Sequence, residues 1–345
     1  MSNATEHRQS NIELLRIICM LFVVMQHFWG HALYPQLQSS NDTTSPAASF
    51  ITLGFMYIAV NCFVLISGYF RIKTTLYKFV SFTFLVIFYN FLSLAFLRLA
   101  GGGTIGRSLI LSTFINCYNN WWFINCYVYL MLVAPILNKA IEQFTSKQLL
   151  NVIIFISIAD LILGYLMNMD NGYSFIHFIF LYVIGAYISK ERIFFDNLKH
   201  WHYLLIYIIC ALLWGLVAFA TSGKDVYFKT NLAYNNPIII IASIAFFNLF
   251  RKLSFSNSLV NKIASLAIAS YLIQDGIGRM LYPWFEKLFY NDSVLMNIAT
   301  MIVGGIVWFI GCSFIEILRQ YIWRGVEKTA TLIPPLHLKR VRKNS

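Results

Sequence analysis

Long apolar stretches alternate with short polar connections along almost the whole chain. Each stretch is long enough to cross the hydrocarbon core of a bilayer as an α-helix, or nearly so. This pattern predicts an all-α integral membrane protein of about ten transmembrane helices, with one multi-pass domain over residues 1–318 and a basic tail over 319–345. The expected spans cover residues 12–34, 47–70, 78–99, 118–138, 149–167, 173–189, 201–220, 233–250, 261–282 and 294–318.

Composition supports a membrane protein and excludes several other classes. Of the 345 residues, 59% are hydrophobic and only 12% are charged, whereas soluble domains carry about 25% charged residues. The net charge of +12 does not indicate nucleic-acid binding, because the Lys and Arg residues lie in short loops between apolar spans. The six cysteines are scattered without a C-x-x-C pair, so we expect neither a metal site nor a disulfide framework.

The basic residues also predict the orientation of the chain. If the N-terminus is cytoplasmic, 19 of the 26 Lys and Arg residues fall in inner segments, six fall in outer segments, and Arg16 lies within the membrane. Short loops rich in Lys and Arg stay on the cytoplasmic side. The sequence therefore predicts that both termini are cytoplasmic.

The first apolar stretch carries ionisable residues at unexpected places. Arg16 and His27 are eleven residues apart, so on a helix they share one face and lie about 16 Å apart along the axis. An ionisable group at the bilayer centre costs roughly 2.5–3.5 kcal/mol. Two such residues on one stripe favour a functional role, although Arg16 could also snorkel to the interface and His27 could be a hydrogen-bonded packing residue.

Three further polar residues accompany this pair. Ser10 and Glu13 have the S-x-x-E spacing of a capping box, which predicts a helix start near Asn11 on the inner side. His31 lies one turn beyond His27 on the same stripe. Capping is the simple alternative to a functional role for Glu13.

Other polar and aromatic residues in the apolar spans have competing interpretations. Ser67-Gly68-Tyr69 near the end of the second span is consistent with close helix packing, and positive-inside topology alone accounts for Arg71 and Lys73. Trp121, Trp122 and Tyr127 fit either an interfacial aromatic belt or a sugar-stacking surface. Asp275 and Arg279 have the i,i+4 spacing of a helical ion pair, whereas Asp160 has no partner nearby in the sequence.

Several of these segments, in order along the chain, resemble the motifs of the integral-membrane acyltransferase-3 family. Two departures concern the family's S-x-x-x-Y-L-x-H element, which here has Gln274 in place of His, and the basic run after S-G-Y, which is only R-I-K. Glutamine cannot shuttle a proton at neutral pH. The matching segments are R-x10-H at 16–27 with Glu13 before it, CFVLISGYF at 62–70, NNWWFINCYVYLMLVAPIL at 119–137, FIFLYVIGAYI at 178–188 and ASLAIASYLIQD at 264–275.

The resemblance implies an O-acetyltransferase of the bacterial cytoplasmic membrane. Such an enzyme moves an acetyl group from cytoplasmic acetyl-CoA, with no permanently bound cofactor, to a hydroxyl of an extracytoplasmic glycan such as a capsule or exopolysaccharide. It implies that His27 acts as base or acyl relay, because its unperturbed pKa lies near working pH. The implied catalytic set is His27, Arg16 and Glu13.

The resemblance also divides the remaining candidate residues between donor and acceptor. Arg16, Arg71 and Lys73 are candidates to hold the phosphates of coenzyme A, and Ser67 and Tyr69 to line the passage or to donate to the carbonyl oxygen. The acceptor side includes His31, Trp121, Trp122, Tyr127 and Gln274.

A transporter or flippase for a lipid-linked sugar is the alternative from another class. Polar residues at membrane depth favour it. The sequence has no internal repeat and few broken-helix signals, and transport gives no reason for R-x10-H and S-G-Y to occur together. Gln274 also leaves open a catalytically inactive scaffold. Release of thiol from acetyl-CoA separates an enzyme from both.

Overall fold

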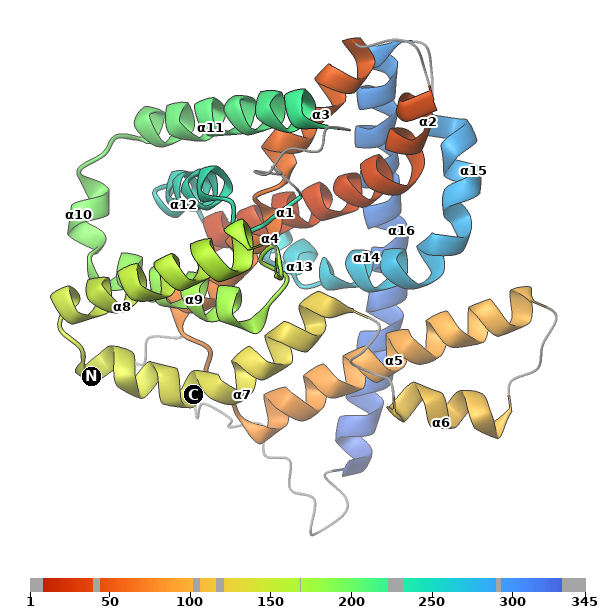
Figure 1. Ribbon diagram of the computed structural model, residues 1–345. Helices are drawn as coiled ribbons and strands as arrows, with labels where there is room; N and C mark the ends of the chain where they lie inside the picture. The colour runs from red at the N-terminus through yellow and green to blue at the C-terminus, as the bar shows by residue number, and fades with distance from the viewer. Residues whose placement is uncertain are drawn as a thin grey trace.

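The computed structural model describes residues 9–39, 44–101, 106–115, 121–167, 169–222, 232–289 and 293–330. The described residues form helices and no strands, which confirms the all-α prediction (Figure 1). The helices are α1 (Ser10–Phe28), α2 (Tyr34–Ser39), α3 (Thr44–Met56), α4 (Ala59–Phe70), α5 (Leu76–Ala100), α6 (Arg107–Ile115), α7 (Trp122–Gln143), α8 (Ser146–Ala159), α9 (Phe175–Lys190), α10 (Arg192–Asp196), α11 (His200–Thr221), α12 (Pro237–Arg251), α13 (Ser258–Ala264), α14 (Ile268–Ile273), α15 (Arg279–Phe289) and α16 (Val294–Ala330).

Three short π-helical segments interrupt or extend these helices. Each carries a polar residue noted in the sequence, namely His31, Asp160 or Gln274. A π-turn inserts an extra residue into a helix and is frequent at functional sites. The segments are Trp29–Leu33, Asp160–Leu166 and Gln274–Gly278.

Apolar helices long enough to cross a membrane are present in the described part of the chain, as expected of a multi-pass membrane protein. Two more apolar helices, α9 and α12, are shorter. The stretch expected to be one span at 261–282 is divided among α13, α14, a π-helical segment and α15. The count of ten and the orientation stay predictions. By length and composition, seven stretches qualify: Ser10–Leu37, Pro46–Phe70, Leu76–Ala100, Trp122–Gln143, Ser146–Leu166, His200–Thr221 and Leu295–Thr329.

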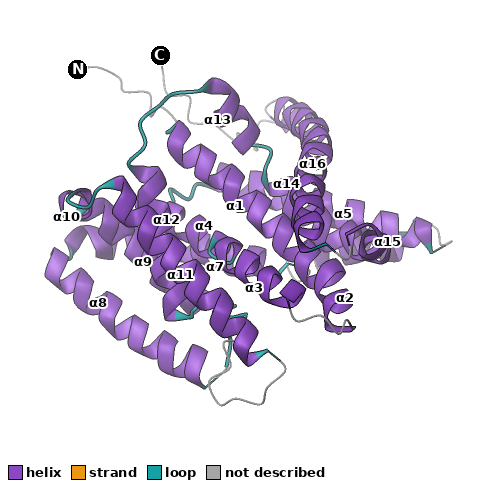
Figure 2. Cartoon of the chain, turned by 90° about the horizontal axis from the view of Figure 1, so that it is seen from above, coloured by secondary structure: helices purple, strands orange, loops and turns teal. Residues whose placement is uncertain are grey.

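Helix α1 lies in the interior of the bundle. It packs against α4 and α12 and, farther along, against α14 and α16, and Figure 2 shows it between these two groups of helices. Leu15, Cys19 and Val24 on α1 are completely buried. The burial follows from the apolar residues that surround the ionisable stripe on this helix.

Helices α4 and α9 approach each other closely because both carry glycine at the contact. A Cβ atom on Gly68 would lie 2.0 Å from the carbonyl oxygen of Tyr182, and one on Gly185 would lie 2.3 Å from that of Leu65. Backbones can touch in this way only where the side chain is absent. The S-G-Y segment and the segment at 178–188 therefore pack directly against each other.

The ends of the chain depart from the expected details. Helix α1 does begin at Ser10, but the capping-box prediction is wrong, because Gln9 is the N-cap residue and makes no side-chain cap. The Ser10 hydroxyl instead accepts a hydrogen bond from the backbone N–H of Asn257 at 2.8 Å. Helix α16 continues past residue 318 to Ala330. The rest of the predicted tail, 331–345, and residues 119 and 120 of the tryptophan motif lie outside the described residues.

Candidate functional site

A pocket of about 700 Å³ opens where α1 begins and α4 ends. We call it the donor pocket, because Arg16, Ser67, Arg71 and Lys73, which the resemblance assigned to the acyl donor, line it. It brings together residues that the sequence places in three separate motifs, because α1, the end of α4, the start of α5 and α7 meet there. Its lining consists of Gln9, Ile12, Glu13, Arg16, Ile66, Ser67, Phe70, Arg71, Ile72, Lys73, Lys78, Phe82, Tyr127 and Met131.

Positive charge dominates the polar lining of the donor pocket. Among the described residues that line it, Arg16, Arg71, Lys73 and Lys78 are cationic and Glu13 is the one carboxylate. Arg16 Nη1 donates to Glu13 Oε1 at 3.0 Å, with Glu13 buried and the Arg16 side chain 34% exposed. Guanidinium and ammonium groups around a cavity of this size can bind the phosphate oxygens of an anionic ligand.

The loop that carries Arg71 and Lys73 is held by neighbouring helices. The Ile72 N–H donates to the Tyr182 hydroxyl at 2.9 Å, and this hydroxyl donates to Asn138 Oδ1 at 2.7 Å. Asn138 Nδ2 donates back to the Ile72 carbonyl oxygen at 2.9 Å, and Thr74 Oγ1 donates to Met131. These bonds fix the two cations of the loop over the pocket.

Arg71 has an uncommon backbone conformation at the end of α4. Its φ is 54° and its ψ is 112°, in a region that favours glycine and is strained for a residue with a Cβ atom. Such strain persists where the surrounding structure holds it, and it is concentrated at ligand and active sites. The position supports a functional reason for the arginine side chain.

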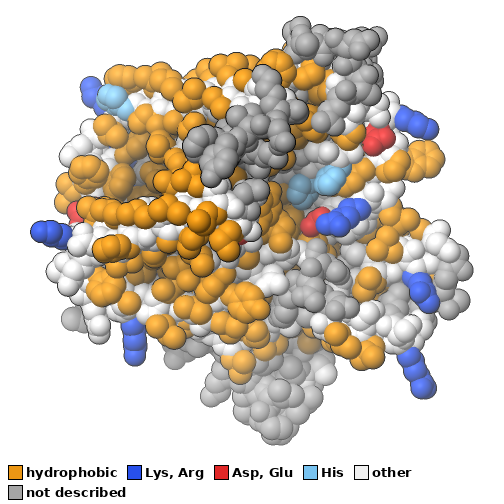
Figure 3. All heavy atoms as spheres, in the orientation of Figure 1, with side chains coloured by type: hydrophobic (Ala, Val, Ile, Leu, Met, Phe, Trp, Pro, Cys, Tyr) orange, Lys and Arg blue, Asp and Glu red, His pale blue; other side chains and the backbone are white. Residues whose placement is uncertain are grey.

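His27 lies near the other end of α1, away from the donor pocket. Its Nδ1 atom is buried and has no hydrogen-bond partner within the described part of the chain. The ring centroid lies 6.1 Å from that of His31 and 6.0 Å from that of Tyr271. In Figure 3, histidine side chains lie beside an acidic and a basic side chain on this face of the molecule.

The polar neighbours of His27 come from the π-helical segment that follows α14 and from the first residue of α15. Asp275 and Arg279 interact electrostatically with the imidazole, and Gln274 is a neutral polar neighbour of it. Gln274 is completely buried and its Nε2 donates to the carbonyl oxygen of Val24 on α1 at 3.0 Å. Asp275 Oδ1 accepts from Arg279 Nη2 at 2.6 Å, as their spacing predicts. We call His27, His31, Gln274, Asp275 and Arg279 the histidine cluster.

His31 contacts His27 on one side and stacks on an aromatic ring of α15 on the other. It lies in the π-helical segment that continues α1, and its ring stacks on Tyr282 with centroids 4.6 Å apart. His31 is exposed, whereas Tyr282 is buried. The arrangement offers one imidazole to the surface and one to the interior, next to an ion pair.

Aromatic rings fill the space between the donor pocket and the histidine cluster. Tyr127, which lines the pocket, stacks on Phe123 with centroids 5.9 Å apart. Phe123 contacts Tyr271 at 6.1 Å, and Tyr271 contacts His27 at 6.0 Å. Three ring contacts therefore connect the two ends of the site.

Three further predicted site residues lie outside the donor pocket, and a fourth lines it. Tyr69 is absent from the donor-pocket lining and packs against Phe247. Trp121 is 1% exposed, so it lies in the protein interior rather than in a lipid-facing belt. Trp122 stacks on Tyr234, with centroids 5.5 Å apart. Ser67 does line the pocket, where its hydroxyl donates to the Phe63 carbonyl oxygen at 2.9 Å.

A buried polar network was missed as a group by sequence reasoning. His177 Nδ1 lies 2.8 Å from Asp160 Oδ2, and His177 Nε2 lies 3.1 Å from Asn61 Oδ1. Asn235 donates to the Asp160 carbonyl oxygen at 3.3 Å. The only signal was the presence of polar residues in apolar stretches, because the partners lie on different helices. Lys78, Tyr182 and Asn138 were likewise not selected as site residues.

Comparisons with known proteins identify the class of the chain. A family model described as an acyltransferase domain matches residues 9–317, which is nearly the whole chain. Comparison with curated proteins found no match, and comparison with solved structures found none either. The matched range contains both the donor pocket and the histidine cluster.

Proposed function

Because the chain belongs to the acyltransferase-3 family and is a multi-pass membrane acyltransferase, we propose that it moves an acetyl group from acetyl-CoA to a glycan hydroxyl. The donor comes from the cytoplasm and the acceptor is an extracytoplasmic glycan, such as a capsule or exopolysaccharide. The observation that carries the proposal is the arrangement on α1. Arg16 lines a cationic pocket near one end, and His27 lies in a polar cluster near the other.

The donor pocket fits the charged end of coenzyme A. The phosphates of this donor carry several negative charges, and Arg16, Arg71, Lys73 and Lys78 converge on the pocket from three elements. Bidentate arginine contacts to phosphate are strong and directional. With the phosphates held there, the flexible pantetheine arm extends along α1 toward His27, about 16 Å away by helical rise.

His27 then serves the chemistry at the thioester. A glycan hydroxyl is a weak nucleophile at neutral pH, and a positioned imidazole can take its proton as it attacks. The oxygen bonds to the carbonyl carbon, the C–S bond breaks, and the proton passes through His27 to the departing thiolate. In the relay version, an imidazole nitrogen takes the acetyl group first, which would give ping-pong kinetics.

The aromatic rings between the donor pocket and the histidine cluster must move if the donor is to reach His27. Phe123 and Tyr271 occupy the line from Tyr127 to His27, so the arm of the donor has to displace them. Side-chain rotation and local helix motion occur faster than a typical turnover. The π-helical segment next to Tyr271 is a natural place for this adjustment, since its hydrogen-bond pattern is already irregular.

The test measures thiol release from acetyl-CoA by the purified protein in detergent, with and without de-acetylated polysaccharide. We expect acceptor-dependent release by the wild type, and a fall of about 10² or more for His27→Ala. His200→Ala, at an exposed histidine of α11, is the matched control and should keep wild-type activity. Full activity in His27→Ala would exclude both roles of His27, and no thiol release by the wild type would favour a transporter.

The acceptor is identified separately. Mass spectrometry of the surface polysaccharide of the host, with and without the gene, should show acetyl groups lost in its absence. An unchanged polysaccharide would move the proposal to another hydroxyl acceptor without affecting the donor side.

A further inference from the structure

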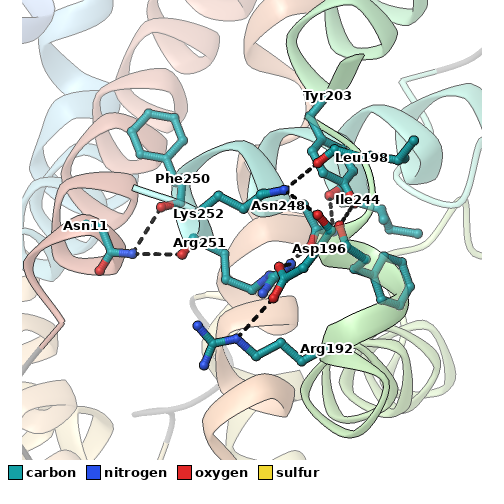
Figure 4. A network of polar contacts seen from close by, with 11 residues as sticks. Asn11, Arg192, Asp196, Leu198, Tyr203, Ile244, Asn248, Phe250, Arg251 and Lys252 are labelled. Carbon is teal, nitrogen blue, oxygen red and sulfur yellow. Dashed lines mark hydrogen bonds and ion pairs between the residues drawn. The ribbon is translucent and has the colours of Figure 1, made fainter. Parts of the chain in front are cut away.

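We propose that the protein has a second phosphate-binding site, at the end of α12, which adjoins the donor pocket and shares only Gln9 with it among the described lining residues. A pocket of about 630 Å³ lies there, between the start of α1, helix α10 and the loop after α12. We call it the α12 pocket. Figure 4 shows the polar contacts around it. Its lining consists of Gln9, Asn11, Arg192, Asp196, Arg251, Lys252, Leu253, Ser254, Phe255 and Ser256.

Arg251 is the residue that points to a ligand. Its side chain is only 1% exposed, yet it lines the pocket. Nε donates to Asn248 Oδ1 at 2.9 Å and Nη2 donates to Asp196 Oδ1 at 2.7 Å. Nη1 is buried and has no partner among the described residues. Buried guanidinium groups normally use their donors, so an unused nitrogen beside a cavity indicates a missing anionic partner.

The charge of the pocket agrees with this inference. Among the described lining residues, Arg192, Arg251 and Lys252 are cationic and Asp196 is the one carboxylate. Both Asp196 oxygens are already engaged, Oδ1 by Arg251 and Oδ2 by Arg192 at 3.6 Å. The remaining positive charge is available to an anion. Nearby serine hydroxyls add neutral donors of the kind that accompany arginine at phosphate sites.

The pocket is held in shape by bonds that involve no ligand. Asn11 Nδ2 donates to the carbonyl oxygens of Phe250 and Arg251, both at 3.1 Å, and of Leu253 at 2.8 Å. Lys252 Nζ donates to the Asp196 carbonyl oxygen at 2.9 Å. The start of α1, the end of α12 and helix α10 are therefore joined around the cavity, which reduces the cost of ordering it on binding.

The surroundings favour a phospholipid headgroup as the source of the phosphate. Ile193 is 84% exposed and Phe194 is 66% exposed on α10, directly after Arg192. Phe255, on the pocket wall, is also exposed. Apolar side chains beside a cationic pocket are suited to the membrane interface, where anionic lipids attract Lys and Arg. A soluble phosphate compound is the other source of the same chemistry.

The experiment measures thermal stability of the purified full-length protein in detergent. Phosphatidylglycerol is compared with phosphatidylcholine at equal concentration, and inorganic phosphate and 3′,5′-ADP form a second arm. A ligand that binds the folded state raises Tm. We expect phosphatidylglycerol to raise the Tm of the wild type more than phosphatidylcholine does, and Arg251→Gln to lose most of that difference.

Two double variants keep the test decisive if Arg251→Gln does not fold. Arg192→Gln with Lys252→Gln removes two cations of the pocket, and Lys139→Gln with Lys147→Gln removes the same charge from exposed positions elsewhere. We expect the first pair to lose at least about half of the lipid-dependent shift and the second to keep it.

The outcomes decide both the site and the source of its ligand. An equal lipid-dependent shift in the wild type and in the Arg192/Lys252 pair would overturn the proposal. Without a lipid-dependent shift, a shift with inorganic phosphate that is abolished in that pair, or a 3′,5′-ADP shift that is reduced in it, would support the site and assign it a soluble ligand. The part of a 3′,5′-ADP shift that survives in that pair belongs to the donor pocket. The readout does not depend on acyl transfer, so failure here leaves the proposed function unaffected.

Discussion

The two ends of α1 place their polar side chains in different surroundings. The donor pocket groups permanently charged side chains around an open cavity of about 700 Å³, where water or a ligand can surround them. The histidine cluster instead packs an imidazole among rings, beside a single ion pair in which Asp275 is largely buried and the Arg279 side chain is 62% exposed. Burying an unpaired charge is far more costly than burying a neutral polar ring. The difference teaches that the cations gather where a cavity is open to a ligand, whereas the imidazole of His27 lies among packed rings.

The largest expected effect comes from His27→Gln. We expect kcat for acetyl transfer to fall about 10²- to 10⁴-fold, because the base or relay is lost. Affinity for coenzyme A should stay unchanged, because His27 does not line the donor pocket. Steady-state kinetics combined with calorimetric titration of coenzyme A measures both quantities. An equal loss of coenzyme A affinity would show that the two ends are not separable.

Arg16→Gln should have the complementary effect. We expect KM for acetyl-CoA to rise about tenfold, the value of one lost charge-assisted hydrogen bond. KM for acetyl-pantetheine, which lacks the nucleotide phosphates, should change little. Arg107→Gln, at an exposed arginine of α6, is the control. A larger KM effect on acetyl-pantetheine than on acetyl-CoA would contradict phosphate binding by Arg16.

Arg71→Gly should separate stability from affinity. Glycine adopts the positive φ of residue 71 without strain, so we expect the free energy of unfolding to rise by about 1 kcal/mol. The KM for acetyl-CoA should increase severalfold, because the guanidinium is gone. Arg71→Ala keeps the strain and loses the same charge. If the Arg71→Gly variant were no more stable than the Arg71→Ala variant in denaturant titrations, backbone strain at residue 71 would not contribute to the free energy of unfolding.

The smallest effect on activity is expected for Gln274→Leu. Its bond to the Val24 carbonyl oxygen joins α14 to α1 beside His27, and one such hydrogen bond contributes about 1 kcal/mol to stability. We expect kcat to fall about twofold to fivefold, since His27 loses a positioning contact rather than its own chemistry. Donor KM should not change. A loss as large as that of His27→Gln would make Gln274 part of the chemistry.

The sequence predicted the features that depend on local pattern. The apolar stretches gave the helical class, and the spacing of Arg16 and His27 placed both on the single helix α1. Arg71, Lys73 and Ser67, which were assigned to the donor, line one pocket with Arg16, and Tyr127, which was assigned to the acceptor, lines the same pocket.

Features that depend on contacts between distant segments were beyond the sequence. The pair of Asp160 and His177 joins two different helices, and nothing in either stretch alone specifies the other. The capping role predicted for Ser10 was replaced by a bond to Asn257, which a local motif cannot anticipate. The division of residues 261–282 arises from a turn at 265–267 and from the π-helical segment Gln274–Gly278. The irregular hydrogen bonding of such a segment leaves no signature in hydrophobic periodicity.

Tyr182 gives the contact between α4 and α9 a mechanical meaning. Its carbonyl oxygen rests against Gly68, while its hydroxyl accepts from the N–H of Ile72 in the cationic loop. Tyr182 thus couples the spacing of α4 and α9 to the position of the loop that carries Arg71 and Lys73. A methyl group added at residue 68 would push Tyr182 away and shift this loop. A purely apolar substitution would therefore change the affinity of the donor pocket for an anionic ligand.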